Sequence, residues 1–163
     1  MPELHRWWGR MAYTDTGGRG LPLVLIPGTG CDLEDWAAVL AGLPPGRRTL
    51  CLDFPGHGAS DNPAQTITLT ALVDDVLALA RHLKIPRMVL VGHSLGGIVA
   101  LAAAARSRRV AGLVLLEGWT NARAAGAFPD VHLYGRLGRA AIRRIAGKLN
   151  RTVAHFRPAA WHR

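Results

Sequence analysis

The sequence predicts an α/β protein whose mostly parallel sheet is covered by helices on both faces, and two observations lead to this prediction. Across the first 120 residues, short runs rich in Val, Leu and Ile alternate with longer amphipathic segments, which is typical of βαβ units. The short runs are apolar throughout, as in strands that are buried on both faces. With 163 residues, of which 49% are hydrophobic, the chain is long enough for one domain, and collagen-like, low-complexity and wholly disordered classes are excluded.

Four strands and three helices are expected in this region. The strands are predicted at residues 21–26, 49–53, 88–91 and 112–116, and the helices at 33–43, 69–83 and 95–106. The second helix has the clearest pattern, because its apolar residues recur at helical spacing and leave Asp74 and Asp75 on the solvent side. Residues 7–16, just before Gly17, are expected to add an antiparallel hairpin at the edge of the sheet.

The positive charge is concentrated at the end of the chain. Of the net charge of +9, nearly all comes from residues 121–163, which hold nine Lys or Arg residues and one acidic residue, Asp130. No further strand is expected after Gly118, so the sheet should end with residues 112–116. Residues 133–149 are expected to form a basic amphipathic helix. Such helices can lie on anionic membranes, but a covering helix that keeps its arginines in water is the favoured interpretation.

Several kinds of function find no support in the sequence. The longest apolar runs are far shorter than the roughly 20 residues that cross a bilayer, and no signal sequence is present, so we expect a cytoplasmic protein without a transmembrane segment. No nucleic-acid recognition module is visible, so no nucleic-acid partner is expected. The seven histidines lack metal-ligand spacing, and Cys31 and Cys51, without a CxxC motif, are expected to be two buried thiols.

The segment Gly92-His93-Ser94-Leu95-Gly96 has the G-x-S-x-G pattern of a nucleophile elbow. It follows a predicted strand and precedes an Ala-rich helix, which is the context that this motif requires. The two glycines allow a turn so tight that larger side chains would collide with the neighbouring backbone. Ser94 is therefore expected at the tip of the turn, where its hydroxyl can attack a carbonyl; the alternative is a serine that only caps the helix.

A nucleophilic serine needs hydrogen-bond donors for the oxyanion that forms when it attacks. The N–H of Leu95 is one candidate, and the N–H of Thr29, in the glycine turn that contains Gly28, is the other. The loop 53–61 is expected at the carboxyl end of its strand, where open α/β sheets place their sites. For that loop, an ordinary well-formed turn is the favoured interpretation.

Together these motifs resemble the α/β-hydrolase superfamily, in particular its single-domain esterases, lipases, epoxide hydrolases, haloperoxidase-like enzymes and carbon–carbon-bond hydrolases. The resemblance extends from about residue 12 to residue 118 and rests on Pro27-Gly28, Trp36, the loop 53–61, the turn at Ser94 and the strand 110–116. It implies a serine hydrolase with Ser94 as nucleophile, Thr29 and Leu95 as oxyanion donors, a small-molecule ester or acyl substrate, and no cofactor or metal. Pro27 stands where the family often has His.

The motifs do not assign the catalytic acid and base. In the family these residues follow the nucleophile after two further strands, which this chain does not reach. The resemblance thus implies that residues 1–120 form the N-terminal part of a hydrolase core and that residues 121–163 begin a cap domain. Glu117 is the best carboxylate for the acid, with an exposed strand-end residue as the favoured alternative, and His93 should point away from the Ser94 hydroxyl. The other candidates for the base are His57, a position that is structural or substrate-facing in the family, and His132, His155 and His162, none of which is favoured by spacing.

Three hypotheses follow. The first is a serine hydrolase that cleaves a carboxylic ester or similar acyl substrate, and the second is a truncated remnant that lacks the triad His. The remnant would expose an unpaired apolar sheet edge and self-associate. The third is a peripheral protein that binds anionic surfaces through residues 121–163.

Overall fold

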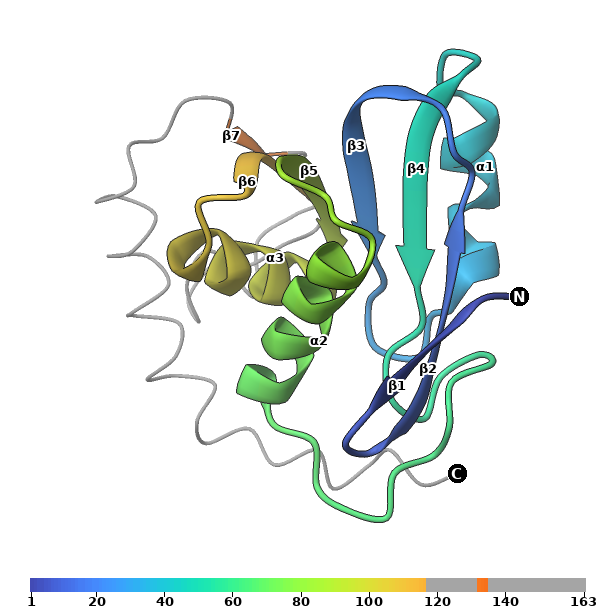
Figure 1. Ribbon diagram of the computed structural model, residues 1–163, viewed down its shortest axis with the longest axis vertical. Coiled ribbons are helices and arrows are strands. Elements are labelled where there is room, and N and C mark those ends of the chain that lie inside the picture. The colour runs from blue at the N-terminus through green and yellow to red at the C-terminus, as the bar shows by residue number, and fades with distance from the viewer. Residues whose placement is uncertain (117–131, 135–163) are drawn as a thin grey trace.

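The computed structural model describes residues 1–116 and the backbone of residues 132–134. Within these residues, seven strands form one sheet in the order β1-β2-β4-β3-β5-β6-β7 (Figure 1). The strands are β1 (Glu3–Arg6), β2 (Gly9–Asp15), β3 (Arg19–Ile26), β4 (Arg47–Leu52), β5 (Met88–His93), β6 (Val110–Leu116) and β7 (His132–Tyr134). The helices are the 3₁₀ helix η1 (Leu33–Trp36) and the α-helices α1 (Ala37–Ala41), α2 (Leu69–His82) and α3 (Leu95–Arg106).

The centre of the sheet is parallel, and its edges are antiparallel. Strands β4, β3, β5 and β6 run parallel. The pairs β2–β4, β1–β2 and β6–β7 are antiparallel. Ile26 at the end of β3 is in register with Gly92 in β5. Because parallel strands point the same way, the segments after β3, β4 and β5 all emerge at one edge of the sheet. The predicted α/β class with a mostly parallel sheet is confirmed, and this edge holds the segments singled out by the motifs.

Helices cover both faces of the sheet, with α2 and α3 on one face and α1 on the other (Figure 1). The larger part of the core lies under α2 and α3 and includes Ile26 and Leu90. On the opposite face, Trp36 of η1 packs with Leu25. Leu25 and Ile26 are adjacent in β3 and both are fully buried, because successive strand residues point to opposite faces. This explains why the strand is apolar throughout.

The sheet does not end at β6, and that prediction was wrong. Strand β7 pairs antiparallel with residues 113–115 of β6. Three residues are too few to show an alternating pattern in the sequence. The strand forms because the edge of β6 has backbone groups available for pairing. The helix predicted at 133–149 is wrong at its beginning, where Leu133 and Tyr134 belong to β7, and its remainder lies outside the described residues.

Two other elements differ from prediction in their bounds. The edge hairpin is antiparallel as expected, but it consists of β1 and β2 and begins at Glu3. The helix predicted at 33–43 is a 3₁₀ turn followed by a short α-helix that ends at Ala41. Its start is fixed by a capping box, in which Asp32 accepts the N–H of Glu34 and Asp35 accepts the N–H of Asp32.

The edge hairpin is fastened to α2 by a buried carboxylate. Asp75 is 0% exposed and accepts hydrogen bonds from Nε of Arg6 at 2.7 Å and from the indole N–H of Trp8 at 2.8 Å. Asp74 does face solvent and pairs with Arg106, so the solvent-side prediction was right for Asp74 and wrong for Asp75. Helical spacing could not reveal this, because the hairpin that covers Asp75 comes from the other end of the described chain.

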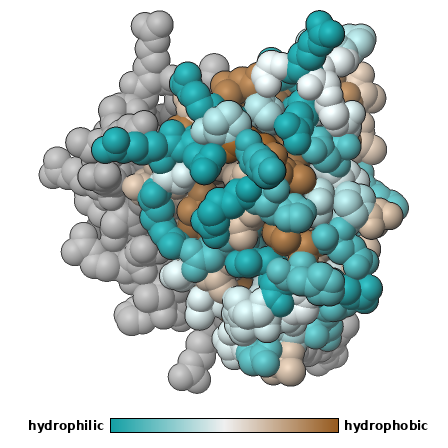
Figure 2. Space-filling model, viewed as in Figure 1, coloured by the Kyte–Doolittle hydropathy of each residue, from teal (hydrophilic) through white to brown (hydrophobic). Residues whose placement is uncertain are grey.

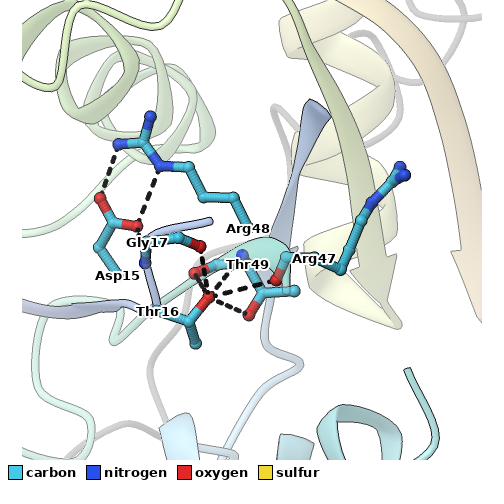
Figure 3. A network of polar contacts seen from close by, with 6 residues as sticks. All are labelled: Asp15, Thr16, Gly17, Arg47, Arg48 and Thr49. Atoms are coloured by element: carbon cyan, nitrogen blue, oxygen red, sulfur yellow. Dashed lines mark hydrogen bonds and ion pairs between the residues drawn. The ribbon is translucent and has the colours of Figure 1, made fainter. Parts of the chain in front are cut away.

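At the opposite end of the sheet from Ser94, a polar network joins β2 to the beginning of β4 (Figure 3). Arg48 donates two hydrogen bonds to the carboxylate of Asp15, at 3.0 Å from Nε and 2.7 Å from Nη2. The hydroxyl oxygen of Thr16 accepts the N–H of Thr49 at 2.9 Å. These contacts fix how the antiparallel edge meets the parallel centre.

The outer surface is mainly polar where it can be seen. Hydrophilic residues cover most of the described part of the face in Figure 2, and hydrophobic residues appear there in small areas between them. Within the described residues, no helix combines the length and the apolar character needed to cross a membrane.

Candidate active site

Ser94 lies in a strained turn between β5 and α3. Its backbone has φ 49° and ψ −114°, a region that costs a non-glycine residue about 1–3 kcal/mol. Two glycines make the turn possible. A Cβ on Gly92 would overlap with the carbonyl of Gly96, and a Cβ on Gly96 would overlap with the carbonyl of Ile26. The turn therefore has the sterics that the G-x-S-x-G spacing predicts.

Backbone hydrogen bonds hold this turn, and the Ser94 side chain takes no part in capping. The N–H of Ser94 donates to the carbonyl of Leu116 at 2.9 Å, and its own carbonyl accepts from the N–H of Gly97 at 2.9 Å. Ser94 is the N-cap residue of α3, yet its side chain makes no capping hydrogen bond. The alternative in which Ser94 only caps the helix is therefore wrong.

The glycine turn after β3 lies directly against Ser94. It is closed by a hydrogen bond of 3.3 Å from the N–H of Cys31 to the carbonyl of Gly28. Gly30 has φ 74°, the sign that a type II turn requires at this position. A Cβ on Gly28 would lie 3.3 Å from Cβ of Ser94 and 2.7 Å from Nδ1 of His93. Only a residue without a side chain allows the two turns to approach so closely.

The two predicted oxyanion donors belong to these adjoining segments. Thr29 follows Gly28 at the exposed tip of the glycine turn. Leu95 is the first residue of α3, and the N–H groups of a first helical turn have no acceptor inside the helix. The structure thus brings Gly28, Ser94 and Leu95 together at the carboxyl edge of the sheet.

Asp53 ties the loop 53–61 to the segment after β3. Its side chain is buried, and its two oxygens accept the N–H of Leu33 at 2.8 Å and the N–H of Ala59 at 2.9 Å. Burial raises the pKa of the Asp53 carboxyl, and the two backbone donors oppose that rise. Gly58 has φ 49°, and a Cβ there would overlap with the Asp53 carboxylate. The loop therefore serves as a support, which agrees with the favoured interpretation of a well-formed turn.

His57, in the same loop, makes a second connection to the glycine turn. Its side chain is buried, and Nε2 accepts the N–H of Gly30 at 3.0 Å. Its other ring nitrogen, Nδ1, lies 2.9 Å from the carbonyl of Pro55. The resemblance implied a structural or substrate-facing position for His57, and this hydrogen bond fits a structural one. The partner itself could not be predicted from the sequence, because the two loops follow different strands.

The two thiols differ in exposure, and only Cys51 is buried as predicted. Burial raises the pKa of the Cys51 thiol to about 11. Cys31 is half-buried, with Sγ 4.0 Å from Nδ1 of His93, so the prediction of a buried thiol was wrong there. Burial, and after it the charge of Asp35, also raises the pKa of the Cys31 thiol. Both thiols are therefore protonated at neutral pH, and neither is an activated thiolate.

The rest of the predicted triad falls outside the described residues. That part of the chain contains Glu117, His155 and His162. For His132 only the backbone is described, in β7 opposite Leu115. Within the described residues, no three His, Cys, Asp or Glu side chains are grouped so that they could hold a metal ion.

A family model described as alpha/beta hydrolase fold matches residues 22–159. Over 116 residues the chain is 43% identical to the dihydrolipoyllysine-residue acetyltransferase component of the acetoin cleaving system of Pseudomonas putida, covering 70% of this chain and 30% of that protein. Over 104 residues it is 38% identical to 2-hydroxymuconate semialdehyde hydrolase of Pseudomonas sp. strain CF600, covering 61% of this chain and 37% of that protein.

Among solved structures, the fold is similar to that of the enol-lactonase from Burkholderia xenovorans LB400. The TM-score is 0.69 and the sequences are 33% identical, with 74% of this chain and 48% of that chain covered. The chain spans about a third of the length of the two curated relatives and about half of the lactonase. The family match at residues 22–159 contains both the glycine turn and the turn at Ser94.

Proposed function

Because the chain belongs to the alpha/beta hydrolase fold family, as its motifs predicted, we propose that it is a serine hydrolase with Ser94 as its nucleophile. The substrate class is a carboxylic ester or a similar acyl compound. The observation that carries the proposal is the strained backbone of Ser94, held between two obligatory glycines while its side chain is left out of helix capping. Such strain at a turn between a strand and a helix is typical of a nucleophile elbow.

In this proposal the Ser94 hydroxyl attacks the carbonyl carbon and gives its proton to a base. The backbone N–H groups of Thr29 and Leu95 donate to the oxyanion that develops, and the amino end of α3 favours its negative charge. The alcohol then leaves with a proton from the base. An acyl group stays on Ser94 until water hydrolyses it, and the hydroxyl is regenerated.

The comparisons support hydrolysis as the reaction class. Two of the relatives are named as 2-hydroxymuconate semialdehyde hydrolase and enol-lactonase, and both names describe hydrolysis of small carbonyl compounds. We propose Glu117 as the acid, with the base among His132, His155 and His162 or in a second chain. We also propose that residues 1–120 belong to the hydrolase core and that residues 121–163 begin a cap.

Labelling with a fluorophosphonate probe tests the proposal, together with hydrolysis of a short-chain p-nitrophenyl ester. The 163-residue chain is compared with Ser94→Ala and with Ser107→Ala, a control at the other end of α3. Labelling of the parent and of Ser107→Ala, but not of Ser94→Ala, is the expected result. Folded parent protein that neither labels nor turns over ester would favour the catalytically incomplete remnant.

A further inference from the structure

We propose that the connection between β4 and α2 forms a second binding site, which takes one small uncharged ring that carries a hydroxyl group. The site is a cavity of about 140 Å³ between residues 54–67 and the first turn of α2. Neither Ser94 nor any residue of the glycine turn lines this cavity. Binding there is therefore separate from the reaction proposed for Ser94.

The inner wall of the cavity is apolar. Phe54 is 1% exposed and Leu72 is 7% exposed, and both side chains also belong to the core under α2. Pro55 is buried as well, and Pro63 and Ile67 are half-buried. In proteins, an apolar cavity of about 150 Å³ lined by Leu, Ile and Phe stays free of water and binds benzene. The volume and the wall therefore favour a single six-membered ring.

The rim of the cavity is polar. Asn62, Gln65 and Thr66 line the cavity and are exposed to solvent. Their amide and hydroxyl groups can donate and accept hydrogen bonds, so a hydroxyl group on the ring finds partners at the rim. An apolar interior with a few polar groups that fix orientation is the usual composition of a small-molecule site.

The lining carries no charge, which excludes an ionic group inside the cavity. All of the lining residues are uncharged. Asp61 precedes Asn62 in the chain, but its carboxylate accepts the N–H of Arg10 at 2.8 Å and Nη2 of Arg10 at 2.9 Å. It is therefore held by β2. A charged ligand would lose its water in the cavity without gaining a counter-ion, so the structure favours a neutral one.

Both ends of the lining segment are fixed, so the cavity exists before a ligand arrives. The N–H of Gly56 donates to the carbonyl of Asp61 at 3.0 Å, which closes the first part of the connection. At the other end, the side chain of Thr68 caps α2 by accepting the N–H of Ala71 at 3.2 Å. Gly56 itself lines the cavity, and a Cβ there would lie 3.3 Å from Oδ1 of Asn62. The absence of a side chain at Gly56 thus leaves this part of the cavity open.

Nuclear magnetic resonance of the ¹³C,¹⁵N-labelled 163-residue chain, titrated with benzyl alcohol, tests the site. We expect amide shifts at Ile67 and Leu72, and nuclear Overhauser contacts between the ring protons and the Leu72 methyl groups. Benzoate, which has the same ring with a carboxylate, should bind about tenfold or more weakly. Absence of contacts to Leu72, or equal affinity for benzoate, would overturn the proposal. Neither result depends on whether Ser94 reacts, so failure here is distinguishable from failure of the proposed function.

Two variants then locate the binding. Ala64 is exposed and lines the cavity, so Ala64→Phe fills the space with a ring of the chain's own and should weaken binding of benzyl alcohol by about tenfold or more. Ala38→Phe is the matched control, because Ala38 is exposed on α1 at the opposite face of the sheet, and it should bind like the parent. Equal affinity in folded Ala64→Phe and parent would refute the site. Should Ala64→Phe fail to fold, the contacts to Leu72 in the parent still decide.

Discussion

Gly28 of the turn after β3 lies against Ser94 of the turn after β5, so closely that a Cβ on Gly28 would be 3.3 Å from Cβ of Ser94. The two residues are far apart in the chain. They meet because β3 and β5 are parallel neighbours and Ile26 is in register with Gly92. The turns that follow these two strands therefore lie side by side at the carboxyl edge of the sheet.

Replacing Gly28 by Ala should impair Ser94 without unfolding the protein. The new Cβ would lie 2.7 Å from Nδ1 of His93, so the glycine turn must move away from Ser94. In the proposed function, an oxyanion donor that has moved away stabilises the transition state less. We therefore expect fluorophosphonate labelling of Ser94 to slow by about tenfold or more. Gly42→Ala is the control, because a Cβ there meets nothing closer than 3.6 Å. Equal labelling rates of the two variants would contradict the close approach described here.

Replacing Asp75 by Ala should destabilise the fold strongly. The change leaves the buried indole N–H of Trp8 and the guanidinium of Arg6 without their acceptor. Removing one partner of a buried pair costs about 3–5 kcal/mol, measured as the free energy of unfolding in urea. Asp74→Ala is the control: its carboxylate is 43% exposed in the pair with Arg106, so about 1 kcal/mol or less is expected. Similar losses in both variants would show that Asp75 is not buried as described.

The ion pair of Asp15 with Arg48 should make the fold sensitive to acid. The hydrogen bonds from Arg48 lower the pKa of Asp15 below its ordinary value of 3.8, although burial opposes the shift. A lowered carboxyl pKa contributes stability that is fully present above the ordinary value and is lost as the pH falls through the folded-state value. In urea titrations between pH 6 and pH 3, Asp15→Asn should therefore lose less stability than the parent. Parallel curves would mean that the pair contributes nothing.

The two thiols should react at very different rates. Burial raises the pKa of Cys51 to about 11 and shields it, whereas Cys31 is only half-buried. With Ellman's reagent at pH 8, we expect one slow-reacting thiol in the native protein and two after unfolding in guanidinium. Cys31→Ser should abolish the native reaction, and Cys51→Ser should leave it unchanged. A native reaction that persists in Cys31→Ser would contradict the assignment.

Much of the candidate site could be predicted from sequence because its requirements are local. Gly92 and Gly96 flank Ser94 in the chain, and the steric conflict that they relieve arises within that one turn. The strand before it and the helix after it are visible as an apolar run and an Ala-rich segment. Glu117, His155 and His162 lie outside the described residues and stay predictions.

The order of strands and helices and the tight turn at Ser94 were determined by the sequence itself, since hydrophobic spacing and backbone sterics act between residues close in the chain. Only the tertiary structure decided that β7 extends the sheet, that Asp75 is buried under the edge hairpin and that His57 holds Gly30. Each of these features joins segments that are not neighbours in the chain. Such hydrogen-bond partners depend on which strands and helices lie next to one another in the fold. A local pattern of residues does not show that arrangement.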